Sequence, residues 1–251
     1  MQGGYHPLYQ QGRQRQPEGY DLHVMTEVIT ILDHYQKLLS EVDFWFTHCS
    51  LVAGKQIACQ RGCSACCRGL FDITLLDARL LREGFELLSQ DMQQTVLAAA
   101  QQSIAGIRNS WPDFDQPYLF NSYPEEEWDL VMPEDDETPC PLLGQDGLCL
   151  VYAHRPMTCR LNGIPLVDTS GEVLFDEWCT LNFTSADPLL MQELRCHFND
   201  IFTQEQLLFR EFTQRLFGKP FNELDTVIPA ALLIDFNAIC LPEQVWKQRT
   251  T

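Results

Sequence analysis

Apolar side chains between residues 21 and 48 recur at steps of three and four positions, the period of a helix that lays one face on a core. The pattern predicts one long amphipathic helix that leads directly into a group of cysteines. Residues 1–20 lack this period and are rich in Gly, Gln, Pro and Arg, so we expect a flexible arm there. The positions that share the apolar face of the helix are Val28, Ile29, Ile31, Leu32, Tyr35, Leu38, Leu39, Val42 and Phe46.

Shorter elements are predicted in the middle of the chain. Residues 71–76 (FDITLL) indicate a short strand. Residues 77–88 and 91–107 indicate two helices, with a break at Ser89 and Gln90 between them. Residues 111–139 contain five prolines and a large excess of acids, which predicts a surface excursion rather than packed structure.

A β hairpin is predicted over residues 163–178, because Asp, Ser and Gly in DTSG supply the turn chemistry between two apolar strands. Helical patterning returns after Asp187, where Thr203 and Gln206 resemble a capping box and Gly218 is placed to end the helix.

The elements together predict a mainly α fold with a small β hairpin. We expect a single domain over residues 21–251, since 45% apolar residues are enough for a buried core. Its irregular cysteine-rich core, residues 59–179, is flanked by helices at residues 21–48 and 187–246. The last apolar stretch, residues 227–241, is expected to pack on the core.

Charge and composition limit the binding partners and the cellular compartment expected for the protein. A formal net charge of −18 argues against non-specific binding to nucleic acid or to an anionic membrane. The sequence has no apolar run near the roughly 20 residues needed to span a bilayer, and its polar beginning lacks the apolar centre of a signal peptide. We therefore expect a cytoplasmic protein, in a reducing compartment where grouped cysteines more often bind metal than form disulfides.

Eight of the eleven cysteines fall into two groups on either side of the acidic stretch. Their short spacings and turn-rich surroundings are typical of loops that converge on a metal ion or a cluster, because thiolate sulfur is a soft donor. Disulfides are the main alternative. The spacing predicts metal or cluster ligation by Cys59, Cys63, Cys66, Cys67, Cys140, Cys149, Cys159 and Cys179.

The adjacent pair Cys66 and Cys67 bears on the kind of centre. Neighbouring side chains point apart on most backbones, so the pair suits two nearby metals, or one ligand with a spare thiol beside it. Eight sulfurs would fill two four-thiolate sites, whereas one cluster of four irons needs only four. We favour an iron–sulfur cluster over Zn²⁺, because eight thiols without a convincing histidine resemble cluster ligation more than a zinc finger.

Several neighbours are predicted to surround such a centre rather than bind metal themselves. Arg155 and Arg160 bracket Cys159 and could offset the charge of thiolates, while Tyr152 and Asn162 could donate hydrogen bonds to sulfur.

The remaining cysteines and the histidines near them have simpler interpretations. Cys49, Cys196 and Cys240 are expected to be core residues, since isolated cysteines are usually buried. For His48, His154 and His197 we expect surface or hydrogen-bonded positions rather than metal ligation.

The cysteine pattern resembles a known family. CQRGCSACC, followed by CPLL, GLCLVYAHRPMTCR and a later cysteine, is similar to the YkgJ-type cysteine cluster proteins, a zinc- or iron-chelating domain family. The resemblance covers about half of the chain. It implies that the first seven grouped cysteines, from Cys59 to Cys159, are metal or cluster ligands, and Cys179 is a weaker match because its spacing is looser.

Three functions are consistent with these features. The first is a metal- or cluster-binding protein in electron transfer, metal handling or sensing. The second is an enzyme like the flagellin lysine N-methylases, which carry a similar cysteine signature, although we find no methyl-donor site in the sequence. The third is a zinc-stapled interaction module whose acidic surface binds a basic protein partner.

Overall fold

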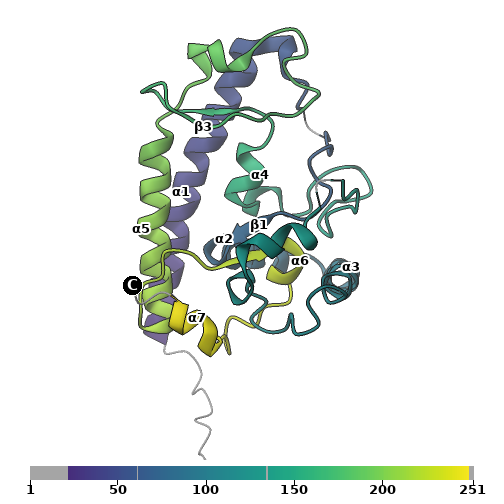
Figure 1. Ribbon diagram of the computed structural model, residues 1–251, viewed down its shortest axis with the longest axis vertical. Coiled ribbons are helices and arrows are strands. Elements are labelled where there is room, and N and C mark those ends of the chain that lie inside the picture. The colour runs from purple at the N-terminus through teal and green to yellow at the C-terminus, as the bar shows by residue number, and fades with distance from the viewer. Residues whose placement is uncertain (1–21, 61, 134, 249–251) are drawn as a thin grey trace, which may run out of the picture.

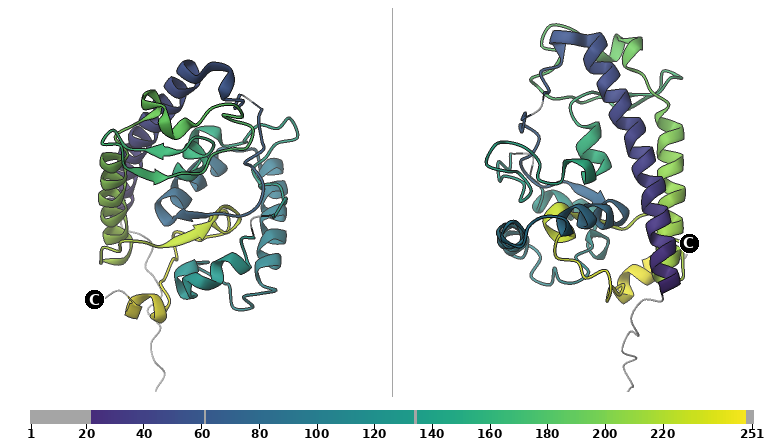
Figure 2. Two further views of the ribbon diagram at one scale, coloured as in Figure 1. Left: turned by 45° about the horizontal axis from the view of Figure 1, so that its top comes forward. Right: turned by 180° about the vertical axis from the view of Figure 1, so that it is seen from behind.

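The computed structural model describes residues 22–60, 62–133 and 135–248, so the arm predicted over residues 1–20 lies outside the described residues. The described chain is mainly helical. Its two longest helices, α1 (Leu22–Ala53) and α5 (Phe198–Phe217), lie side by side along one flank, and α3 (Gln90–Ile107) lies at the opposite side (Figures 1 and 2). The mainly α fold class with a small β hairpin is thereby confirmed.

Helix α1 confirms the first predicted element and continues past residue 48 to Ala53. Most of the predicted apolar face is buried, with Tyr35, Leu39 and Val42 fully enclosed. Ile29 was wrongly placed on this face and is 49% exposed. It follows Val28 directly, and one step on a helix turns the side chain away from the buried stripe.

Side-chain caps fix the starts of the next two helices. Helix α2 (Leu75–Glu86) begins two residues before the predicted Asp77, because the Thr74 hydroxyl accepts a hydrogen bond from the Asp77 N–H. Ser89, predicted to lie in a break, is the corresponding cap of α3 and accepts from the Met92 N–H.

Two small antiparallel sheets complete the regular structure. Strands β2 (Leu166–Val167) and β3 (Val173–Phe175) form the predicted hairpin. The predicted strand at residues 71–76 is β1 (Asp72–Thr74), which pairs with β4 (Asp225–Val227). Strand β4 was not predicted.

The C-terminal part packs on the core, as predicted for residues 227–241. Helix α6 (Ile228–Ala231) follows β4 directly and is buried throughout, and helix α7 (Glu243–Gln248) ends the described chain. Between the sheets, the short helix α4 (Met157–Leu161) carries Cys159.

The prediction that residues 111–139 lack packed structure was wrong for their first half. Trp111, Phe114 and Phe120 are buried, and Trp111 stacks on Tyr123 with ring centroids 4.1 Å apart. Two 3₁₀ turns, Phe120–Ser122 and Glu125–Leu130, follow. Closely spaced aromatic rings supply enough apolar area to fold this segment despite its prolines.

The predicted capping box was also wrong. Two 3₁₀ turns, Pro188–Leu190 and Gln192–Leu194, follow Asp187, and α5 begins only at Phe198. Thr203 therefore lies inside the helix, where its hydroxyl donates to the Asn199 carbonyl. Gly218 ends α5 in a left-handed conformation, as predicted. In the described ranges, no helix has the length and apolar character needed to cross a membrane.

A buried carboxyl at β4 makes stability depend on pH. Asp225 is 5% exposed and accepts a hydrogen bond of 3.0 Å from the Asn121 amide. Burial, above all, raises the pKa of Asp225 to about 8, so its proton is bound more tightly in the folded chain than in the unfolded one, where the pKa is about 3.9.

We expect this proton to contribute stability that is fully present below about pH 4 and is lost as the pH rises towards about 8, by up to about 1.4 kcal/mol per pH unit. Asp225→Asn removes the titrating group while keeping the shape of the side chain, so its unfolding free energy should fall less steeply over this range. Urea unfolding at several pH values measures both slopes, and equal slopes would contradict the assignment.

Candidate metal centre

The first cysteine group lies in tight turns between α1 and β1. The Cys63 N–H donates to the Gln60 carbonyl at 2.9 Å, and the Cys67 N–H donates to the Ser64 carbonyl at 3.0 Å. These turns place the four cysteines of the group in one tightly turned segment of nine residues. Cys66 is exposed, and the other three thiols are half-buried.

Backbone pairing joins the two cysteine groups. The Cys140 N–H donates to the Cys67 carbonyl at 2.9 Å, and the Gly69 N–H donates to the Thr138 carbonyl at 2.9 Å. Arg68 and Pro139 form an antiparallel bridge between these two bonds. Segments about seventy residues apart in the sequence are thus held side by side, with a cysteine in each.

Two further cysteines are held beside this pairing. An antiparallel bridge between Leu143 and Cys149, with the Leu150 N–H donating to the Leu142 carbonyl at 2.9 Å, folds the second group back on itself. Cys159 is presented by α4.

Four thiols influence one another electrostatically, and we call Cys67, Cys140, Cys149 and Cys159 the first cysteine set. Burial raises the pKa of Cys140 to about 11, and the nearby Cys149 adds to this. Burial likewise raises the pKa of Cys159 well above its usual value, with contributions from Cys140 and Cys149. The pKa of Cys67 is also affected by this set: the charges of Cys140, Cys159 and Cys149 each raise it.

A second set forms around Cys59. Burial raises the pKa of Cys59, and the nearby Cys63, Cys179 and Cys66 add to this. Gly163 lies between Cys59 and Cys179. A β-carbon added to this glycine would lie 3.5 Å from Cys59 Sγ and 3.8 Å from Cys179 Cβ, so both cysteines pack against the same position. We call Cys59, Cys63, Cys66 and Cys179 the second cysteine set.

Cys66 and Cys67 form the boundary between the sets. Cys66 donates a hydrogen bond to Cys67, which raises the pKa of Cys66 and lowers that of Cys67. Cys66 also lies within electrostatic range of Cys140 and Cys159. The adjacent thiols therefore lie where the two sets meet.

Arg155 and Arg160 lie beside the first set. Each forms an ion pair with Asp43 on α1, and Arg160 also donates to the carbonyls of Ala153 and Arg155. The charges of both guanidinium groups lower the pKa of Cys149, although burial outweighs them. Tyr152 is 61% exposed, and its ring lies 4.0 Å from the Arg155 guanidinium, so its contact is with arginine rather than sulfur.

The amide that contacts sulfur belongs to Asn182, which was not predicted. Asn182 is 1% exposed and donates to Cys59 Sγ at 3.4 Å and to the Gly163 carbonyl at 2.7 Å, while its oxygen accepts from the Ala58 N–H at 2.8 Å. Asn162, which was expected to contact sulfur, is exposed. A lone Asn three residues after Cys179 carries no local signal of this role.

All eleven cysteines are free thiols, so the disulfide alternative is not realised. The donor chemistry suits a soft metal. Within the described ranges, however, no group of three or more His, Cys, Asp or Glu has an arrangement that could hold a metal ion as it stands. Ligation would therefore require the cysteine-bearing turns to close around the metal, a coupling of binding to folding that is common in metal-binding domains.

The isolated cysteines and the histidines lie mostly as expected. Cys49 is fully buried and Cys196 is half-buried, but Cys240 is exposed and was wrongly assigned to the core. His48 and His197 are exposed, and the half-buried His154 packs on Gly84 of α2.

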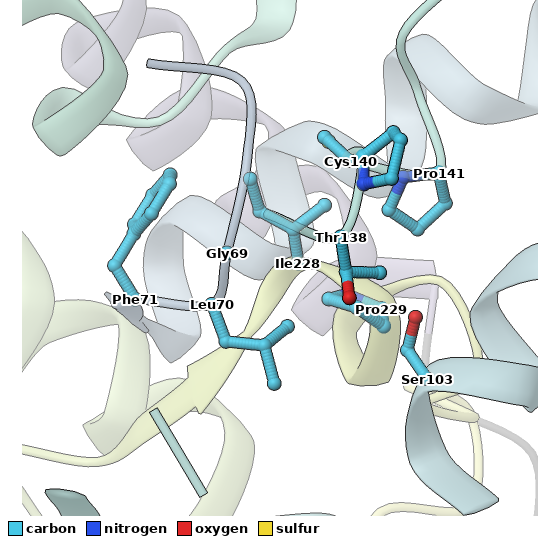
Figure 3. Close-up of a pocket in the computed structure, with 10 residues that line it drawn as sticks. Gly69, Leu70, Phe71, Ser103, Thr138, Cys140, Pro141, Ile228 and Pro229 are labelled. Carbon is cyan, nitrogen blue, oxygen red and sulfur yellow. The ribbon is translucent and has the colours of Figure 1, made fainter. Parts of the chain in front are cut away.

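A small apolar notch adjoins Cys140 (Figure 3). Leu70 and Phe71 line one side and Ile228 and Pro229 the base, around a cavity of about 10 Å³. This is the space of roughly one water molecule, so the notch shields one side of Cys140 without offering a substrate pocket.

Comparison with known proteins supports a metal centre. Residues 58–180 match the family model CxxCxxCC, described as a putative zinc- or iron-chelating domain. The match includes all eight grouped cysteines. No curated protein and no solved structure matches the chain.

Gly163→Ala tests the packing around Cys59. Gly163 has φ +104°, and an added β-carbon would lie 3.3 Å from the Asn182 amide. We expect a loss of about 1–3 kcal/mol in unfolding free energy and displacement of the Asn182 contact with Cys59. Chemical denaturation measures the loss. Gly106→Ala in α3, where an added β-carbon meets nothing within 4 Å, is the control and should be neutral or stabilising.

Proposed function

Because residues 58–180 belong to the CxxCxxCC family of putative zinc- or iron-chelating domains, we propose that the eight grouped cysteines are the metal ligands of this protein. The hydrogen bond between the Cys140 N–H and the Cys67 carbonyl carries this assignment, because it joins the two halves of the motif. Without that pairing, neither cysteine set could form, because each set combines thiols from both groups.

We propose two four-thiolate centres, one for each cysteine set. Electrostatic effects on the thiol pKa values support this division. The four thiols of the first set influence one another. In the second set, Cys63, Cys179 and Cys66 each raise the pKa of Cys59. It also accounts for the adjacent Cys66 and Cys67, since neighbouring thiols serve two centres better than one.

The first centre is the better candidate for an iron–sulfur cluster. An iron–sulfur cluster would supply one-electron transfer, and zinc would supply a structural cross-link. The cationic groups of Arg155 and Arg160 would offset part of the negative charge of the thiolates beside Cys149. Roles in electron transfer, metal handling or sensing follow from such a cluster, whereas zinc in both centres would favour a stapled interaction module.

A reducing compartment such as the cytoplasm suits this assignment. Grouped cysteines without disulfides are more common in reducing compartments than in oxidising ones. The net charge of −18 points to a basic surface on any protein partner.

Metal analysis distinguishes the two kinds of centre. Anaerobically purified protein is expected to be brown with broad visible absorption, and to contain iron and acid-labile sulfide. Removing the metal with a chelator should loosen residues 59–179, which hydrogen exchange would detect as lost protection. Colourless protein with stoichiometric zinc would contradict the iron–sulfur assignment, and protein with no bound metal would contradict the proposed function.

Single Cys→Ser variants test the division into two sets. Cys149→Ser should lose the metal of the first set and keep that of the second, and Cys63→Ser should do the reverse, so that each retains only part of the wild-type metal content. Cys240→Ser, at an exposed cysteine outside both sets, is the matched control and should retain all of it. Circular dichroism checks that each variant is folded. Complete metal loss in folded Cys149→Ser would show that the chain builds a single centre.

A further inference from the structure

Three buried oxygen-bearing side chains meet between helices α1, α2 and α5, away from the cysteine turns. The Tyr35 hydroxyl lies 2.8 Å from Asp77 Oδ1 and 2.8 Å from Glu205 Oε1. Tyr35 and Asp77 are almost fully buried, and Glu205 is half-buried. Neither the cysteine motif nor the helical pattern accounts for two carboxyl groups at this position.

The number of hydrogens in this group is fixed by its geometry. A tyrosine hydroxyl carries one hydrogen and can donate it to only one carboxyl oxygen at full strength. If both carboxyl groups were ionised, the single hydroxyl hydrogen could bond to only one of them. The other carboxylate oxygen would then face a lone pair of the Tyr35 oxygen, so two contacts of 2.8 Å call for a second hydrogen. This geometry favours a protonated acid at one of the two carboxyl groups.

Hydrogen-bond donors identify which carboxyl group is protonated. Asp77 receives three: the Met157 N–H at 3.0 Å, the Tyr35 hydroxyl, and the Thr74 hydroxyl at 3.3 Å. Among the described residues, Glu205 has Tyr35 as its one hydrogen-bond partner. Donors stabilise an ionised carboxylate, so Asp77 is the carboxylate and Glu205 is the acid that donates to the Tyr35 oxygen.

Burial favours the protonated form of both carboxyl groups. Burial, followed by the charge of Asp77, raises the pKa of Glu205 to about 7. Burial also raises the pKa of Asp77, while its hydrogen bonds to Met157, Tyr35 and Thr74 lower it.

The group is connected to the candidate metal centre through α4. Met157, whose N–H donates to Asp77, begins the helix that carries Cys159, and the Asp77 charge contributes to raising the pKa of Cys159. Arg160 on the same helix is engaged by Asp43 and two carbonyls. On the solvent side, the groove between α1 and α5 beside Gln204 is lined by the charged or titratable His34, Lys37 and Glu41.

We propose that Glu205, Tyr35 and Asp77 form a proton-holding chain in which Glu205 keeps its proton in response to the charge of the metal centre at Cys159. The response of Glu205 to metal binding rests on the proposed function, whereas the presence of its proton does not. Each thiol that binds a metal releases its proton to solvent, and four thiolates around one divalent ion leave an excess of two negative charges. That charge disfavours ionisation of Glu205, so the proton is held to higher pH when the metal is bound.

Infrared spectroscopy of the full chain tests the proposal. The carbonyl stretch of a protonated carboxylic acid is followed against pH in protein stripped by a chelator and in the same protein reloaded with Zn²⁺. In an Asp225→Asn background, which removes the other buried acid with a raised pKa, we expect a band at neutral pH that Glu205→Gln removes and that disappears at higher pH in the zinc-loaded sample than in the stripped one. Glu211→Gln, at an exposed residue of the same helix, should leave the band unchanged.

Tyr35→Phe provides an independent measurement if Glu205→Gln does not fold. The acid then loses the oxygen to which it donates, and its band should shift in frequency. A stripped protein without the band, or with a band that neither variant changes, would overturn the proton assignment. Equal pH midpoints in stripped and stoichiometrically loaded protein would overturn the link to the metal. If elemental analysis finds no metal in the protein as purified and none after zinc loading, the proposed function has failed and the link with it, while the stripped sample still decides whether Glu205 holds the proton.

Discussion

The pairing of residues 67–69 with residues 138–140 is the constraint on which the candidate centre depends. Closing a loop of this length costs chain entropy that grows only slowly with length, and burial of the intervening segments must offset this cost. Helices α2 and α3 and the aromatic cluster around Trp111 provide that burial. The intervening chain is therefore the scaffold that brings one cysteine-bearing segment to the other.

The same burial gives the sulfur site its chemical character. Enclosed thiols such as Cys140 and Cys159 have raised pKa values, because a thiolate in apolar surroundings is poorly solvated. A bound metal would supply the positive charge that the surroundings lack. The protein supplies part of this charge through Arg155 and Arg160, although both guanidinium groups are also paired with Asp43. This combination favours thiols that stay neutral until a metal displaces their protons.

A protein with a net charge of −18 also buries carboxyl groups, at Asp77, Glu205 and Asp225. Each lies where separate segments meet: Asp77 and Glu205 on the Tyr35 hydroxyl, and Asp225 against Asn121. Of these, Glu205 and Asp225 can retain a proton and so connect elements by hydrogen bonds without adding to the negative charge of the molecule, whereas Asp77 is assigned as the carboxylate. They make these contacts sensitive to pH in a way that apolar packing is not.

The sequence by itself determined the long helix α1, the two helices that follow β1 and the hairpin. It also identified the two cysteine groups as a metal-chelating motif. Periodicity, caps and ligand spacing act over a few residues, so one sequence suffices to recognise them. Tertiary structure alone decided that Cys179 lies near Cys59, that Asn182 contacts sulfur, that Trp111 and Phe120 are buried, and that Tyr35 joins two carboxyl groups. These features depend on which distant segments share a surface, and that choice is made by the packing of the whole core, for which no short stretch of sequence carries a signal.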